Sequence, residues 1–161
     1  DAALDEITIL LSRARAAGTP ILHVAHLGRP GGLFDPEAEG GRIHAKAAPS
    51  DGETVVTKGL PNSFAGTTLQ AEIDRTGRSK LILAGFQTHM CVSATARAAL
   101  DLGYRSTVVA SAAATRDLPG IAGGVVRAQA LHDAELAALA DRFAVIAPTA
   151  GDVPDKAASA G

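Results

Sequence analysis

The chain has 161 residues, of which 47% are hydrophobic and 20% charged, a composition typical of one soluble globular domain that can bury a sizeable core. Its net charge of −2 and its lack of tryptophan give no electrostatic or base-stacking reason to bind nucleic acid or an anionic membrane. The single cysteine excludes an internal disulfide framework, and no stretch reads as a transmembrane helix or a secretory leader, so we expect a cytoplasmic protein.

Helical and extended patterns alternate from the start of the chain. Apolar residues recur at helical spacing over residues 2–17, and Gly18 ends that helix. The apolar stretch 20–26 predicts a buried strand, residues 27–50 a long Gly- and Pro-rich loop, and residues 53–58 a second strand. Loops of this length in compact domains are usually functional or mobile. The loop is therefore either mobile surface or a lid over an active site.

The alternation continues through the second half of the chain. The expected elements are a helix at 67–76, a strand at 80–84, a helix at 92–102, a strand at 105–110, a helix at 124–140 and a strand at 143–147. Strands that alternate with helices predict right-handed crossovers and a parallel, Rossmann-like sheet in a three-layer α/β/α fold. We expect one domain over residues 1–147 and a flexible C-terminal tail over residues 148–161.

Two reactive side chains fall at the carboxyl ends of predicted strands, where parallel sheets bind their ligands. Lys58 ends the strand 53–58 and is either a snorkelling surface residue or a cation beside a nucleophile. Cys91 lies at a strand-to-helix turn, where the helix dipole favours a thiolate, although a buried cysteine can also serve as a small hydrophobe. Gly85 permits a sharp turn before it, and unpaired N–H groups at a helix start can stabilise an oxyanion.

Two motifs resemble those of one enzyme family, and the resemblance extends over nearly the whole chain. The run AGFQTHMCVSATARAALDLGY resembles the signature of the isochorismatase-like cysteine hydrolases, and KGLPNSFAGTTL resembles that family's Lys-x-x-x-Ser-x-Phe-x-Gly-Thr-x-Leu block. The resemblance implies that Cys91 is the nucleophile and Lys58 the cationic member of an Asp–Lys–Cys triad. It also implies a cis peptide between Phe86 and Gln87, with the backbone N–H groups of Gln87 and Cys91 forming an oxyanion hole.

The triad's aspartate has no counterpart in this sequence. In the family it ends a first strand, ahead of the helix with which this chain opens, and no Val-x-Asp-x-Gln segment occurs here. Asp1 and Asp5 lie in the wrong element to replace it. The family's first strand is central in its sheet, and its absence would leave neighbouring strands with unpaired backbone groups. We therefore expect the functional protein to have an N-terminal segment that this sequence lacks.

Four further side chains are candidates for contact with a substrate. His26 ends a predicted strand, Phe34 lies in the long loop together with the alternatives Ile43 and His44, Phe64 belongs to the Lys58 block, and His89 precedes the nucleophile by two residues.

The pattern of histidines does not indicate a metal site. His23 and His26 lie three residues apart on one strand, so their side chains point to opposite faces, and His23 is expected to be a satisfied core residue. The Asp-x-His-x-x-His cluster of the family's metal-dependent nicotinamidases does not occur in the sequence. His132 is expected on a solvated helix face. We therefore predict no metal and no cofactor.

The function implied by the resemblance is hydrolysis of an amide-type C–N bond in a small molecule through a Cys91 thioester. The alternatives are an isochorismatase-type vinyl-ether hydrolase that does not need the cysteine, a non-catalytic or regulatory homologue, and a redox-sensing thiol. The expected partners are a small-molecule substrate and further copies of the chain in a homo-oligomer, with no nucleic acid and no membrane.

Overall fold

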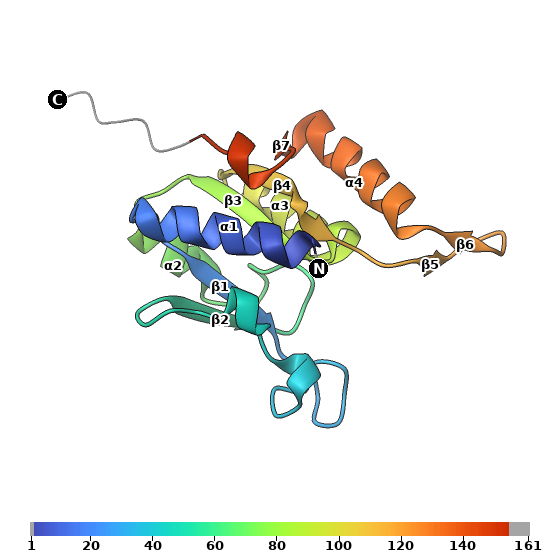
Figure 1. Ribbon diagram of the computed structural model, residues 1–161, viewed down its shortest axis with the longest axis horizontal. Helices are drawn as coiled ribbons and strands as arrows, with labels where there is room; N and C mark the ends of the chain where they lie inside the picture. The colour runs from blue at the N-terminus through green and yellow to red at the C-terminus, as the bar shows by residue number, and fades with distance from the viewer. Residues whose placement is uncertain (1, 155–161) are drawn as a thin grey trace.

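The computed structural model describes residues 2–154 and alternates helices with strands (Figure 1). The helices are α1 (Ala2–Ala16), α2 (Leu69–Arg75), α3 (Ser93–Asp101) and α4 (Ala128–Arg142). The strands are β1 (Leu22–His26), β2 (Thr54–Lys58), β3 (Lys80–Phe86), β4 (Arg105–Ala114), β5 (Leu118–Pro119), β6 (Val125–Val126) and β7 (Ala144–Ala147). Over this described range, no helix has the length and apolar character needed to cross a membrane.

The strands form two parallel sheets and one short hairpin. One sheet has the order β3-β4-β7, the other pairs β1 with β2, and β5 pairs with β6 in antiparallel fashion. Within residues 2–154 no ladder joins the β1–β2 sheet to the β3–β4–β7 sheet. In the described residues, the single parallel sheet that was predicted is therefore divided into two parallel sheets.

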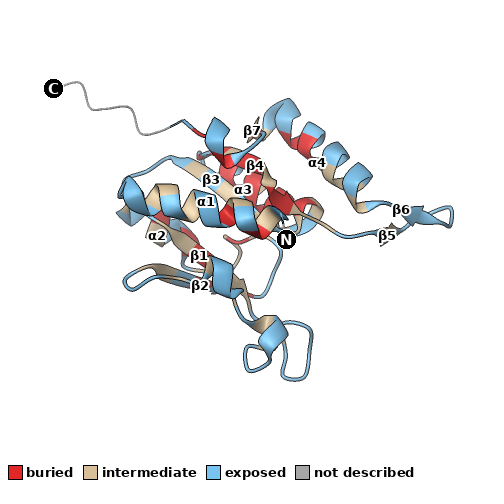
Figure 2. Cartoon of the chain, viewed as in Figure 1, coloured by how far each residue is buried: buried red, intermediate tan, exposed pale blue. Residues whose placement is uncertain are grey.

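Helices cover both faces of the β3–β4–β7 sheet. On β4, Val109 belongs to a buried cluster with Leu4 of α1, whereas Val108 belongs to a buried cluster with Leu136 and Leu139 of α4. Because successive strand residues point to opposite faces, α1 and α4 lie on opposite sides of this sheet. The buried residues accordingly gather on β4 and on the helix surfaces that face it (Figure 2). The predicted three-layer α/β/α fold is confirmed.

The segment between β4 and α4 differs from the prediction. β4 continues to Ala114, and the short hairpin β5–β6 precedes α4, which begins at Ala128 rather than at residue 124. The carboxylate of Asp117 accepts a hydrogen bond of 2.8 Å from the N–H of Ala128. This hydrogen bond, followed by the guanidinium of Arg127, lowers the pKa of Asp117. The helix start is therefore set by an acceptor eleven residues earlier in the chain.

The chain also remains packed beyond residue 147. Residues Ala150–Asp152 form a short helical turn, and the N–H of Ala150 donates to the carboxylate of Glu6 on α1 at 2.7 Å. Arg13 of α1 donates to the carbonyls of Ala150 and Val153, and Val153 is buried in the α1 cluster. The packed domain thus extends to residue 153, and residues 155–161 of the predicted tail lie outside the described residues.

Candidate active site

The only cysteine lies in an irregular turn between β3 and α3. The strand ends at Phe86, the peptide bond between Phe86 and Gln87 is cis as the resemblance implied, and residues Thr88–Val92 form a single π-helical turn before α3 begins. Gly85 has a φ of 121°, a backbone conformation that side chains rarely allow. π-helical turns occur frequently at functional sites. Cys91 is a partly exposed free thiol within this turn.

Lys58, the last residue of β2, lies against this thiol. Its Nζ is 3.1 Å from the Sγ of Cys91, and only 6% of the lysine is exposed. The same Nζ donates to the carbonyls of Leu60 at 2.8 Å and Pro61 at 3.1 Å. An ammonium has three N–H groups, and the two carbonyls and the sulfur are the three partners closest to Nζ. The burial and these contacts exclude a snorkelling surface role and favour a cation that stabilises a thiolate.

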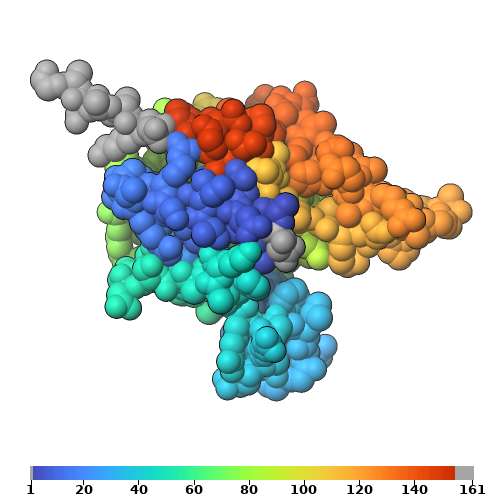
Figure 3. All heavy atoms as spheres, viewed as in Figure 1, coloured from blue at the N-terminus to red at the C-terminus, as the bar shows by residue number. Residues whose placement is uncertain are grey.

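His26 lies beside Lys58, and Phe34 lies beside His26. His26 pairs with Lys58 in the β1–β2 register, and its Nδ1 lies 3.5 Å from the lysine Nζ. Burial, and then the positive charge of Lys58, lower the pKa of His26, so the ring is neutral at neutral pH. The Phe34 ring lies 4.9 Å from the His26 ring between centroids. Much of the loop that carries Phe34 forms a separate lobe at the bottom of the view in Figure 3.

The other two substrate-contact candidates make their contacts elsewhere. The Nδ1 of His89 forms a close hydrogen bond with the hydroxyl of Thr115, just after β4. The ring of Phe64 stacks on buried Tyr104 at 5.8 Å and packs against the core cluster that contains Val56. The structure therefore places His89 on the turn Thr88–Val92, hydrogen-bonded to the residue after β4, and places the partly buried Phe64 against the core.

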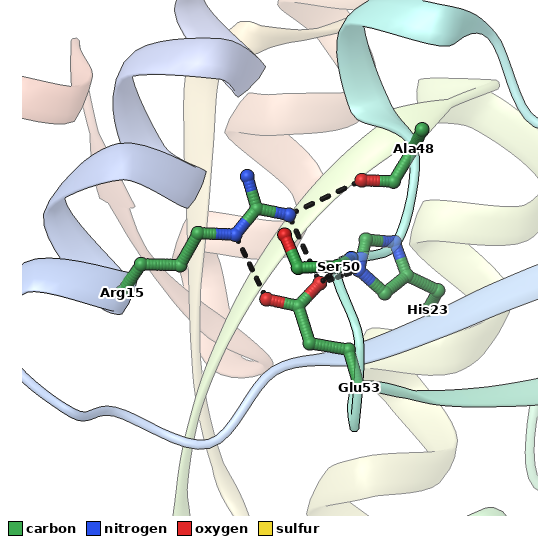
Figure 4. A network of polar contacts seen from close by, with 5 residues as sticks. All are labelled: Arg15, His23, Ala48, Ser50 and Glu53. Atoms are coloured by element: carbon green, nitrogen blue, oxygen red, sulfur yellow. Dashed lines mark hydrogen bonds and ion pairs between the residues drawn. The ribbon is translucent and has the colours of Figure 1, made fainter.

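The end of the long loop is fixed by a polar network around Glu53 (Figure 4). Arg15 of α1 donates to its carboxylate at 2.8 and 2.9 Å, the N–H of Ser50 at 2.9 Å, and the Nε2 of His23 lies 2.8 Å away. These contacts, led by the hydrogen bond from Arg15, lower the pKa of Glu53 well below its ordinary value. His23 is buried and hydrogen-bonded here, which confirms the prediction of a satisfied core histidine.

The sequence and the fold of the chain both match known proteins. An isochorismatase domain matches residues 1–151 of the chain. The chain belongs to the isochorismatase family. The crystal structure of an isochorismatase from Pseudomonas putida KT2440 has 45% sequence identity and a TM-score of 0.91, and the match covers 94% of this chain and 77% of that one.

Two curated relatives in the family have named activities. A streptothricin hydrolase from Streptomyces noursei is 38% identical over 154 residues, which are 94% of this chain and 55% of that protein. A maleamate amidohydrolase from Pseudomonas putida is 31% identical over an alignment of 123 residues, and the match covers 67% of this chain and 58% of that protein. The chain is therefore similar both to a hydrolase and to an amidohydrolase of this family.

The residues to which the resemblance assigns two places in the family's triad lie together, and the described residues bring no carboxylate to them. Lys58 and Cys91 lie in contact, as the resemblance implied. Within residues 2–154, the hydrogen-bond partners of the Lys58 Nζ are His26, two backbone carbonyls and Cys91, and none is a carboxylate. Asp5 instead pairs with Lys46 of the long loop, away from the thiol.

The structure adds two residues of α4 that sequence reasoning did not assign to the site. The Nδ1 of His132 lies 2.9 Å from the hydroxyl of Thr88, so the expected solvated position of His132 is wrong. Glu135 accepts a hydrogen bond from Ser93, the first residue of α3. The spacing of His132 and Glu135 could have indicated a shared role, because residues three apart on a helix lie on the same face.

Proposed function

We propose that the chain is a cysteine hydrolase of this family that cleaves an amide-type C–N bond in a small molecule. The contact of 3.1 Å between Lys58 Nζ and Cys91 Sγ carries the proposal, because a cation at this distance favours the nucleophilic thiolate. The similarity to a maleamate amidohydrolase supports the amide as the bond that is cleaved. The alternative vinyl-ether hydrolase does not need the cysteine, so a cation held against the thiol favours cleavage of the amide.

The reaction proceeds in two halves. The Cys91 thiolate attacks the carbonyl carbon, a C–S bond forms, and the carbonyl oxygen becomes an oxyanion. When the oxyanion collapses, the C–N bond breaks and the leaving nitrogen takes a proton from the Lys58 ammonium, so ammonia or an amine departs and a thioester remains. Water then attacks the thioester carbonyl, one of its protons returns to the Lys58 amine, the C–S bond breaks, and a carboxylic acid and the thiolate are released.

We assign the stabilisation of the oxyanion, which forms when the amide is attacked and again when the thioester is attacked, to the turn that holds Cys91. The carbonyl of Gln87 accepts hydrogen bonds from the N–H groups of Met90 at 3.0 Å and Val92 at 3.2 Å, so this carbonyl faces into the turn. In our proposal the N–H groups of Gln87 and Cys91 donate to the oxyanion, a contribution that typically accounts for about 10²- to 10³-fold in kcat per donor.

The test is an ammonia-release screen over neutral and anionic primary amides, with acid quenching and mass spectrometry of the peptide that contains Cys91. We expect at least one amide to give ammonia and an acyl adduct on Cys91. Cys91→Ala and Cys91→Ser should abolish both signals, whereas Ile121→Ser, at an exposed site in the β5–β6 hairpin, should leave them unchanged.

Two outcomes would overturn the proposal. Turnover that survives Cys91→Ala would identify chemistry that does not use the thiol, as in a vinyl-ether hydrolase. Absence of ammonia and of any acyl adduct across the panel, from a folded protein, would favour the non-catalytic homologue.

A further inference from the structure

Helix α4 holds the start of the nucleophile turn through a buried hydroxyl. Thr88, the first residue of the turn, is fully buried, and its Oγ1 lies 2.9 Å from the Nδ1 of His132. A buried hydroxyl without a partner is costly, so this contact favours one orientation of the Thr88 side chain. The start of the turn is thereby connected to a helix that lies next to it in space but 44 residues away in the sequence.

The same helix holds the residue that follows the turn. The carboxylate of Glu135 accepts hydrogen bonds from the Ser93 hydroxyl at 2.5 Å and from Arg97 at 3.1 Å. Arg97 also donates to the Ser93 hydroxyl at 3.1 Å and lies over the Phe143 ring, 4.3 Å from its centroid. Ser93 is buried, and the side chain of Glu135 is 19% exposed. Charge-assisted hydrogen bonds of this kind are stronger than neutral ones.

The two contacts therefore lie on either side of Cys91. We propose that His132 and Glu135 are positioning residues, which hold the turn Thr88–Val92 from both ends and so keep the Cys91 sulfur in contact with Lys58. This inference rests on the proposed function, because it assigns a purpose to the geometry of the same thiol.

These polar contacts are not needed to attach α4 to the domain. Leu136 and Leu139 of α4 are buried in one cluster with Val92, Ala96 and Val108, so apolar packing already fixes the helix on the sheet. Loss of a polar contact should therefore change the turn more than the fold, which allows a positioning role to be separated from a stabilising one.

The test measures the second-order rate constant for alkylation of Cys91 by iodoacetamide in the full chain, which has no other cysteine to react. Thr88→Val and His132→Leu should each slow alkylation about five- to tenfold, the effect of losing about one buried hydrogen bond. The double variant should be no slower than either single variant, because both remove the same contact. His132→Asn, which keeps a hydrogen-bonding side chain, should recover most of the rate.

The second contact is tested with Glu135→Leu, which should slow alkylation by a similar factor, and Glu135→Gln, which keeps an acceptor oxygen and should recover part of the rate. Gln129→Ala is the matched control, since it removes a hydrogen bond of α4 to Asp133 that does not touch the turn. Hydrogen exchange of the peptide that spans residues 86–93 should be faster in the Leu and Val variants and unchanged in the control.

Rate constants equal to or higher than that of the parent chain, or additive effects in the double variant, would overturn the proposal. A lower melting temperature with unchanged alkylation would also overturn it, because it would show a purely structural role. None of these measurements uses a substrate, so a failed amide screen and a failed positioning role are distinguishable.

Discussion

Removal of the Lys58 charge is the most direct test of the site's electrostatics. Lys58→Met keeps the length and apolar stem of the side chain but removes the cation 3.1 Å from Cys91 Sγ. At that distance a pair of unit charges attracts by about 1 kcal/mol at a dielectric constant of ~80 and by about 5 kcal/mol at an effective value of ~20. Since about 1.4 kcal/mol is a factor of ten, complete loss of this attraction corresponds to a factor of about ten to ten thousand in an equilibrium constant.

The alkylation rate should fall by less than this factor. A thiolate that is less stabilised is also a stronger nucleophile, and Brønsted coefficients of about 0.4 to 0.5 offset roughly half of the change on a logarithmic scale. We therefore expect iodoacetamide to react with Cys91 in Lys58→Met about three- to one-hundredfold more slowly than in the parent chain at pH 7.

The control for this experiment is Lys80→Met. It changes the net charge by the same amount, at an exposed position at the start of β3, and should leave the rate unchanged. Circular dichroism establishes that both variants are folded. If Lys58→Met reacts as fast as the parent chain, the ammonium does not stabilise the thiolate, and the electrostatic argument for the nucleophile is refuted.

Three more substitutions test the surroundings of the site. Phe34→Ala removes the ring that contacts His26, and an aromatic pair contributes about 0.5 to 1.5 kcal/mol, so KM for an amide substrate should rise about two- to twelvefold with little change in kcat. Glu53→Gln should lower the melting temperature at pH 7. Because the pKa of Glu53 in the folded chain lies well below its ordinary value of 4.5, the carboxylate of the unfolded chain takes up a proton first as the pH falls below 4.5, and the difference between the parent chain and the variant should shrink over that range. Leu139→Ala, at a fully buried position, should lower the free energy of unfolding by about 2 to 5 kcal/mol in a urea titration.

The central pair of the site could be predicted because it follows from topology. Lys58 and Cys91 are 33 residues apart, but each follows or ends a strand of a parallel α/β chain, and the carboxyl ends of such strands lie on the same side of the domain. Gly85 and the apolar run before it located the turn. The cis peptide before Gln87 could be expected only from the family resemblance, since no spacing of residue types indicates it.

The parts that could not be predicted depend on contacts between distant segments. Phe64 belongs to the same motif as Lys58, yet its ring is directed to Tyr104 of the core by the packing of α2 and α3. His132 could not be distinguished from a surface histidine, because its partner Thr88 lies on an element that meets α4 only after folding. The start of α4 depends on Asp117, on the other side of a hairpin whose strands of two residues carry no readable period.

The burial of Lys58 determines which neighbouring groups must compensate its positive charge. A buried ammonium is costly unless anions or oriented dipoles compensate it, and the carbonyls of Leu60 and Pro61 supply two such dipoles. The other described contacts of Nζ are the Nδ1 of His26 and the sulfur of Cys91, and of all these groups the sulfur, as a thiolate, is the one that can carry a full negative charge. His26 reinforces this preference, because its low pKa keeps a neutral ring rather than a second cation beside the lysine. The described contacts of Lys58 therefore suit a negative charge on the neighbouring sulfur, and in the proposed reaction that charged sulfur attacks a carbonyl carbon.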